Sequence, residues 1–246
     1  MTARPTTNHE PRTANTLVLL LQSECLVLLL AIVYFLALLP FTPGFAAPGN
    51  LQNILITMLP LVVVALGQTV VLITCGIDLS VCSTMALASV VGALAMNGEH
   101  GWLAGSALAT PVGILLMLLV GAGVGLLNGA AVTALRMPPF IVTLTSMMFV
   151  SGLAIWLTQS KTIYGLPAAF NALGGRTWLA LLIAAGVALA AHFMLGRSLW
   201  GRWLYAVGHN AKAAVISGVP VTGVTASAYV VSGVTAAIAA ILYTGQ

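Results

Sequence analysis

One acidic residue in this sequence is the main candidate for a functional role. The only aspartate, Asp78, lies in the run Thr74-Cys75-Gly76-Ile77-Asp78-Leu79-Ser80-Val81-Cys82-Ser83, between two apolar stretches. A charge at the centre of a membrane helix costs about 2.5–3.5 kcal/mol, so such a residue usually has a partner or a function. Gly76 and Ser80 indicate that one helix ends and another begins here, with Ser80 or Asp78 as the N-cap. Two interpretations stay open: a capped turn just inside the membrane interface, or a polar segment that lines a path through the protein.

Several enzyme classes lack their required residues. An aspartyl protease needs two carboxylates that share a proton, and a zinc metalloprotease needs the pattern H-E-x-x-H; the sequence has neither. No serine stands in a GxSG context, and neither lysine follows glycine in a phosphate-binding loop. We therefore expect no enzyme activity and no ATP site in this chain. If ATP drives the protein, the ATPase is a separate subunit.

Cysteine usage indicates no metal or redox site. The three cysteines, Cys25, Cys75 and Cys82, form no CxxC pair and have no histidine nearby. We interpret them as small buried hydrophobic residues and expect neither a metal nor a cofactor in the chain.

The composition of the chain requires lipid as its solvent. Hydrophobic residues make up 60% of the 246 positions and charged residues only 5%, whereas about a quarter of a soluble domain is charged. The net charge of +4 comes from thinly spread basic residues without a dense patch, so a nucleic-acid partner is not expected.

The apolar stretches predict an all-α, polytopic transmembrane helix bundle. A helix needs roughly 20 apolar residues to cross a hydrocarbon core about 30 Å thick. Residues 1–16 form a polar tail, and residues 17–246 form the transmembrane domain, whose first helix is too long for a cleaved signal. About seven spans are expected: Leu17–Leu39, Leu51–Thr74, Ser80–Met96, Ala107–Leu135, Phe140–Thr158, Trp178–Leu195 and Val221–Tyr243.

Basic residues indicate the orientation of these spans. If the spans alternate, the ends that share a side with the N-terminus carry six basic residues, and the opposite ends carry only Lys161 and Arg176. The positive-inside rule then places the N-terminus and the segment 196–220 in the cytoplasm, and the loops 97–106 and 159–176 outside. The six are Arg4, Arg12, Arg136, Arg197, Arg202 and Lys212.

Small residues predict one packing surface. Gly121, Gly125 and Gly129 share a helix face, and Gly113 lies two turns earlier on the same stripe. Such glycines let neighbouring helix backbones approach closely in lipid.

The cytoplasmic segment 196–220 contains signals for a short helix. Asn210 is a plausible N-cap, residues 211–217 would form about two turns, Gly218 would be the C-cap and Pro220 the stop. A helix that docks on a cytoplasmic partner and a helix that merely lies at the interface would look alike at this level.

Three runs resemble known permeases. GQTVVLITCGIDLSVCS (67–83) and GRWLYAVGHNAKAAVISGVPV (201–221) are similar to two signature segments of ribose-type ABC importer permeases, a group in the superfamily that also contains branched-chain amino acid permeases. Between them, NGAAVTALRMPPFIVTLTSMMFVSGLA (128–154) is similar to the junction of the fourth and fifth spans in that family. The combination of GIDLS with YAVGxN is much more specific than either motif alone. Cys82 departs from the glycine that is usual in the first segment.

This resemblance implies a transport role, partners and a location. It implies a multi-pass protein of the bacterial inner membrane that pairs with a second permease chain, cytoplasmic ABC ATPase subunits and an extracytoplasmic solute-binding protein. Relative to the family, the chain looks shortened at its C-terminal end. The helix that couples to the ATPase would comprise Gly201, Arg202, Tyr205, Gly208, Asn210, Ala213, Ser217 and Gly218.

The cargo and its path are less defined. The scarcity of membrane-embedded charge favours a small neutral polar solute such as a monosaccharide, although a branched-chain amino acid or another solute stays an alternative. A secondary transporter or channel that uses Asp78, with Glu24 as the other embedded acid, and a non-transporting scaffold are the competing classes. The signature segment and pathway candidates are Gly76, Asp78, Ser80, Ser83, Gln68, Thr69, Asn128, Thr143, Thr145 and Ser146, each of which could equally make a hydrogen bond between helices.

Overall fold

The computed structural model describes residues 26–99 and 101–246, and within these ranges it contains helices and no strands. The polar tail 1–16, Glu24, Cys25 and the beginning of the first expected span lie outside the described residues. The helices are α2 (Leu26–Leu38), α3 (Pro48–Ile73), α4 (Val81–Met96), α5 (Ala109–Thr133), α6 (Pro139–Thr158), α7 (Ala168–Gly175), α8 (Thr177–Arg197), α9 (Leu199–Ile216) and α10 (Val221–Thr244).

The chain divides into two units, residues 1–51 and 52–246. In the first unit, a turn follows α2, and the rings of Phe35 and Phe45 lie 5.0 Å apart across it. The side-chain amide of Asn50 donates a hydrogen bond of 2.7 Å to the backbone carbonyl of Phe45, which connects the beginning of α3 to this turn.

Seven apolar helices occupy the positions of the seven expected spans. Five of them, α3, α5, α6, α8 and α10, are long and apolar enough to cross a membrane, whereas α2 and α4 are shorter in the described part of the chain. At 1.5 Å per residue, the 16 residues of α4 reach about 24 Å, less than the hydrocarbon thickness. The segment 159–176, expected as a loop, contains α7, and α9 fills most of 196–220, where only a short helix over 211–217 was expected from the local signals.

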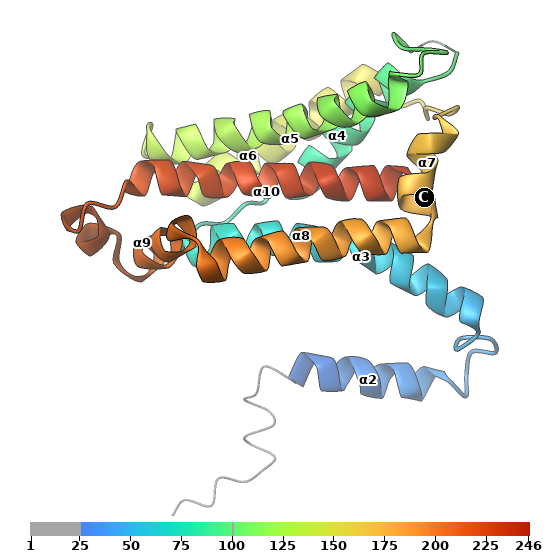
Figure 1. The fold of residues 1–246 in the computed structure, drawn as a ribbon, viewed down its shortest axis with the longest axis horizontal. Helices are drawn as coiled ribbons and strands as arrows, with labels where there is room; N and C mark the ends of the chain where they lie inside the picture. The colour runs from blue at the N-terminus through green and yellow to red at the C-terminus, as the bar shows by residue number, and fades with distance from the viewer. Residues whose placement is uncertain (1–25, 100) are drawn as a thin grey trace, which may run out of the picture. The chain divides into compact units, whose positions relative to one another are not determined.

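Helix α10 is the centre of the second unit. Its apolar window is 61% buried, against 17–33% for the other four long helices. Figure 1 shows α3 and α8 on one side of α10, α4, α5 and α6 on the other, and α7 and α9 at opposite ends of the bundle. The buried face of α10 is rich in alanine, so its neighbours approach closely from both sides.

The predicted glycine surface on α5 packs against α10. A Cβ atom at Gly121 would collide with the backbone of Gly233, one at Gly125 with the backbone of Tyr229, and one at Gly129 with the backbone of Ala226. We call these three α5 glycines the small-residue seam. The fourth expected member, Gly113, instead faces the side chain of Met96 on α4, with which a Cβ atom at this position would collide.

Candidate functional site

Residues 74–80, here called the break, separate α3 from α4 without regular structure. Cys75 takes a positive φ of 59°, so the chain turns sharply as soon as α3 ends. The next residue is Gly76, where a Cβ atom would lie only 2.7 Å from the hydroxyl oxygen of Tyr229 on α10. A larger residue would therefore not fit here. Irregular backbone at membrane depth is tolerated only where protein or water covers it. Here the buried side chain of Tyr229 contributes to that cover.

Asp78 is buried inside the bundle, with 5% of its surface exposed. Its Oδ1 accepts hydrogen bonds from the Ser80 amide at 3.0 Å and the Ser80 hydroxyl at 2.6 Å. Its Oδ2 accepts one from the hydroxyl of Ser232 on α10, at 2.8 Å. Both carboxylate oxygens are therefore satisfied by neutral donors, and Asp78 has no cationic partner within residues 26–99 and 101–246.

Ser80 links this carboxylate to α5. The Nδ2 of Asn128 donates to the Ser80 hydroxyl at 2.8 Å, so hydrogen bonds run from Asn128 through Ser80 and Asp78 to Ser232. We call these four buried residues the polar cluster. Ser80 occupies the N-cap position of α4, but its side chain makes no capping bond. Ser80 thus lies at the expected N-cap position but does not cap the helix with its side chain. Its hydroxyl donates a hydrogen bond to Asp78 instead.

Other candidate polar residues surround the cluster or lie apart from it. Ser83, with its neighbour Thr84, donates back to the Ser80 carbonyl. Thr143 on α6 donates to the Pro139 carbonyl at 2.9 Å and more weakly to the Ile77 carbonyl of the break at 3.4 Å. Gln68, in contrast, has a buried side-chain oxygen without a hydrogen-bond partner in the described part of the chain.

A groove of about 290 Å³ lies between α5 and α6 beside the cluster. It brings together three residues proposed from sequence, Asn128, Thr145 and Ser146, with apolar walls that include Leu127 and Phe149. Thr69 does not join them, because its exposed hydroxyl bonds to the carbonyl of Ala65 in its own helix.

Two residues of the site, Ser232 and Tyr229, were missed by the sequence interpretation. Ser232 precedes Gly233 in a run of small residues, and a hydroxyl on the buried face of a central apolar helix is the signal that could have found it. The buried assignment of the cysteines was also wrong for Cys75 and Cys82, which are both exposed.

Helix α9 begins at a tight corner after α8. The Ser198 hydroxyl caps it by accepting a bond of 2.9 Å from the Gly201 amide. A Cβ at Gly201 would collide with carbonyl oxygens at the end of α8, so glycine is required here. Arg202 and Tyr205, on the same helix, are exposed.

At Asn210 the backbone leaves helical geometry, with φ −159° and ψ 97°, and α9 is divided into two segments. The side chain of Asn210 accepts a hydrogen bond of 3.1 Å from the Ala213 amide and so caps the second segment, as predicted. This segment ends at Ser217, and Gly218 takes the positive φ of 80° that a glycine stop predicts. The expected helix over 201–218 is therefore two helices joined at Asn210.

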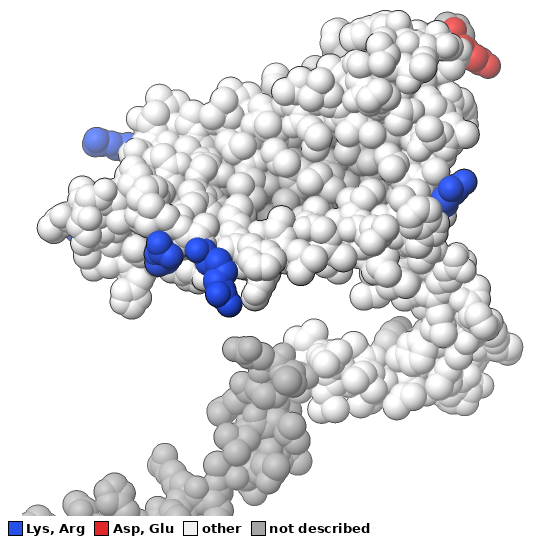
Figure 2. Space-filling model, in the orientation of Figure 1, with Lys and Arg blue, Asp and Glu red and all other residues white. Residues whose placement is uncertain are grey.

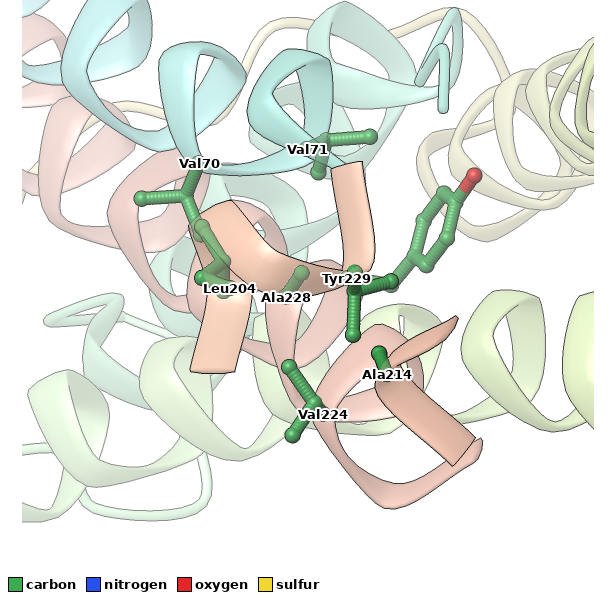
Figure 3. Packing of buried hydrophobic residues seen from close by; sticks show 8 residues of the cluster. Val70, Val71, Leu204, Ala214, Val224, Ala228 and Tyr229 are labelled. Carbon is green, nitrogen blue, oxygen red and sulfur yellow. The ribbon is translucent and has the colours of Figure 1, made fainter. Parts of the chain in front are cut away.

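The second segment is exposed except for Ala214. Ile216 is 88% exposed and Val215 60%, although both are apolar. Ala214 anchors the segment in a buried cluster at this end of the bundle (Figure 3), which is formed by Val70, Val71, Leu204, Val207, Ala214, Val224, Ala228 and Tyr229.

Helix α9 also touches the end of α3. Gly208 lies so close to the carbonyl of Ile73 that a Cβ would collide with it. The Cys75 thiol contacts the Gly208 carbonyl at 3.4 Å. Gly208, expected as part of a docking surface, thus serves a contact within the chain.

Apart from the buried Asp78, the charged side chains of the described residues lie at the two ends of the bundle. Figure 2 shows most of the basic side chains at the end that holds α9, while the visible acidic side chain lies at the opposite end. In chain order, Arg136 follows α5 and Arg197 ends α8, which puts both near α9, whereas Lys161 and Arg176 flank the segment with α7. This distribution agrees with a cytoplasmic α9 end.

The end opposite α9 has a cavity of about 460 Å³, lined by residues that include Glu99, Lys161 and Tyr164. Two hydrogen bonds hold its rim: the Gly98 amide donates to the Gly165 carbonyl at 3.0 Å, and the Asn97 side chain donates to the Tyr164 carbonyl at 2.8 Å. The loops expected on the outside are therefore joined to one another.

The chain is similar in sequence to curated permease proteins from bacteria. The permease protein LsrC of the autoinducer 2 import system from Yersinia enterocolitica is 36% identical over 194 residues, which cover 76% of this chain and 51% of the relative. LsrC from Photorhabdus luminescens is 34% identical over 190 residues, covering 76% and 55%. The chain thus spans about half the length of these curated relatives. No solved structure matches it.

The family described as "Branched-chain amino acid transport system / permease component" matches residues 50–246, which is most of the chain and includes the break, the polar cluster and α9. The resemblance seen in the sequence motifs is therefore confirmed at the level of the family. The apolar helices and this membership identify a multi-pass protein of the bacterial inner membrane. The chain belongs to the family of branched-chain amino acid transport system permease components.

Proposed function

We propose that the chain is a membrane-spanning permease subunit of an ABC importer that admits a small neutral polar solute of the sugar type. The observation that carries this proposal is the separately capped segment after Asn210, which presents exposed Val215 and Ile216 beyond the end of the bundle. An exposed apolar pair on a polar rim is typical of a docking surface. Its partner would be a cytoplasmic ATPase subunit.

The same segment is suited to pass movement into the membrane. Through Ala214 it rests on a cluster that includes residues of α3 and α10, and Gly208 in the first segment of α9 touches the backbone where α3 ends. A push on the exposed face would therefore act on α3, which leads into the break, and on α10, whose side chains contact the break. Rigid-body rocking of packed helices is the expected response.

The groove between α5 and α6 supports the choice of solute. Its polar atoms come from an amide and two hydroxyls, and no charged side chain lines it. Such groups suit a hydroxylated neutral molecule, and the LsrC relatives carry a name that refers to autoinducer 2 import. We propose that a second permease chain, identical or homologous, completes the path and that a solute-binding protein delivers the solute at the α7 end.

The competing secondary transporter finds less support. Both oxygens of Asp78 already accept hydrogen bonds from the same chain, and the buried carboxylate is used to hold the break to its neighbours, which argues against a role in binding a coupling ion. Uptake into sealed vesicles separates the two hypotheses. We expect uptake that needs ATP inside the vesicle; uptake driven by an ion gradient without ATP would favour the secondary transporter.

Docking is tested by isolating the tagged chain from its native membranes in mild detergent and measuring the ABC ATPase that co-purifies. Replacing Ile216 with glutamate should remove most of the ATPase, because a charge would be buried at the interface. The matched control is Trp102→Glu, since Trp102 is an equally exposed apolar residue, at 84%, near the opposite end. Equal ATPase yield from both variants, or no ATPase with the unchanged chain, would contradict the proposal.

A further inference from the structure

Two side chains of α10 hold the break. The Tyr229 hydroxyl reaches the Ile77 carbonyl at 3.5 Å, and the Ser232 hydroxyl donates to Asp78 Oδ2 at 2.8 Å. Residues three apart on a helix lie on the same face, so both contacts come from one side of α10. Of the two, the bond from Ser232 is the shorter and involves a carboxylate, which makes it the stronger.

The other attachments of the break lead to different helices. Asp78 Oδ1 is bound only by Ser80, which begins α4, and Ser80 is bound in turn by Asn128 of α5. Asp78 Oδ2 has Ser232 as its donor. Without Ser232, the carboxylate would stay attached to α4 and α5 but lose its bond to α10.

Helix α9 contacts both α10 and the end of α3, from which the break begins. Its Trp200 side chain donates a hydrogen bond of 2.8 Å to the Ser227 hydroxyl on α10, and its Gly208 lies against the end of α3 at Ile73. Movement of α9 would therefore reach α10 and the beginning of the break at the same time. Of the two bonds that make the break follow α10, the one between Ser232 and Asp78 is the stronger, and the weaker one runs from Tyr229 to Ile77.

We propose that Ser232 is a positioning residue that fastens the break to α10, so that the break and α10 move as one body when α9 is displaced. Its use in transport rests on the proposed function, whereas the fastening itself is a property of this chain. The bond joins residues 154 positions apart. In the sequence, its only sign is a serine among small residues.

Cys75 provides a direct measure of this fastening. Its thiol is exposed within the break, and a maleimide reagent should reach it faster when the break is loosened. The assay uses the full chain with Cys25→Ala and Cys82→Ala, so that Cys75 alone reacts. In this background we compare Ser232→Ala with Thr235→Val.

Thr235→Val is the matched control because it removes a buried hydroxyl one turn further along α10. That hydroxyl donates only to the Ser232 carbonyl of its own helix. We expect Ser232→Ala to raise the labelling rate of Cys75 about tenfold, the effect of losing one hydrogen bond to a charged group. Thr235→Val should change it less than about twofold, as the loss of a bond within one helix predicts. Equal rates in Ser232→Ala and the unchanged chain, or equal acceleration by both variants, would overturn the proposal.

If Ser232→Ala does not accumulate as folded protein, Asp78→Asn serves as the second variant. The amide keeps the shape of the carboxylate and can still pair with Ser80 and Ser232, but through weaker neutral bonds. We expect a smaller acceleration of labelling, of about threefold. An unchanged rate in this variant would equally count against the fastening role.

The effect of Ser232 on the coupling of ATP hydrolysis to solute uptake is measured on the complex of the chain with its ATPase. Ser232→Ala should retain the ATPase and its ATP hydrolysis while solute uptake per ATP falls about tenfold, a split that simple misfolding would not produce. If no ATPase binds the unchanged chain, the proposed function fails, but the labelling result still decides the role of Ser232. If ATPase binds and uptake per ATP is unaffected, the role in coupling is wrong.

Discussion

The chain interrupts its helices in two places, and the two interruptions are stabilised in opposite ways. The break before α4 contains two buried polar residues, Asp78 and Ser80, which bind each other and are also bound by side chains from α5 and α10. The interruption at Asn210 lies on the surface, where the residue at the interruption caps the following segment itself. A buried interruption needs donors from distant parts of the chain, whereas an exposed one needs only its own side chain and water.

This difference predicts how each region responds to mutation. Damage to the buried break should destabilise the whole bundle, because its donors sit on the central helix. Damage at Asn210 should stay local and affect only what α9 does at the surface.

The small-residue seam should be the most sensitive feature that supports the buried break. Gly125→Val places a side chain against the backbone of Tyr229, and we expect a loss of about 3 kcal/mol in the free energy of unfolding. Unfolding in a rising fraction of SDS, followed by circular dichroism, measures this loss. Gly123→Val is the control on the same helix, since a Cβ there meets nothing within 4 Å. Similar losses in both variants would show that valine itself, and not the contact with α10, is responsible.

Removing the carboxylate should cost somewhat less. Asp78→Ala leaves the hydroxyls of Ser80 and Ser232 and the Ser80 amide without their acceptor, and we expect a loss of about 2 kcal/mol in unfolding free energy. The same SDS titration measures it. Asp78→Asn should recover about half of the loss, because the amide oxygen still accepts. A fully stable Asp78→Ala variant would mean that water replaces the carboxylate and that the break is not dry.

The exposed interruption should respond only locally. Asn210→Ala removes the cap of the second α9 segment and should destabilise that segment by about 1 kcal/mol without changing the unfolding of the bundle. Amide hydrogen exchange measures this as faster exchange confined to residues near 213. Asn210→Asp should restore protection, because a carboxylate caps equally well. Faster exchange across α10 would show that the two interruptions are not independent.

A fourth test should leave stability almost unchanged, but it decides on which side of the membrane each end of the bundle lies. In a chain without its native cysteines, Lys212→Cys should react with a membrane-impermeant maleimide only after the cells are opened. Lys161→Cys, at the opposite end of the bundle, should react in intact cells. The reverse pattern would put the exposed interruption outside the cell, beyond the reach of any ATPase.

The amount that the sequence could predict follows the same division between local and distant contacts. Asn210, Gly218 and the seven apolar helices were predictable because capping, glycine stops and apolar length are properties of neighbouring residues. The contact between Ser232 and Asp78 was not, since nothing in either neighbourhood specifies a partner 154 residues away. The glycine pattern on α5 predicted close packing but could not name α10 as the partner or exclude Gly113.

The central place of α10 has a consequence for how the protein is made. A ribosome delivers α3, α4, α5 and α8 to the membrane before α10, although α10 is the helix around which they pack. Until residues 221–244 are inserted, the three α5 glycines lack the α10 backbone against which they pack, and Asp78 lacks its hydrogen bond from Ser232. The packing among the earlier helices therefore changes during biosynthesis, when α10 is inserted between them and provides the surface that they share.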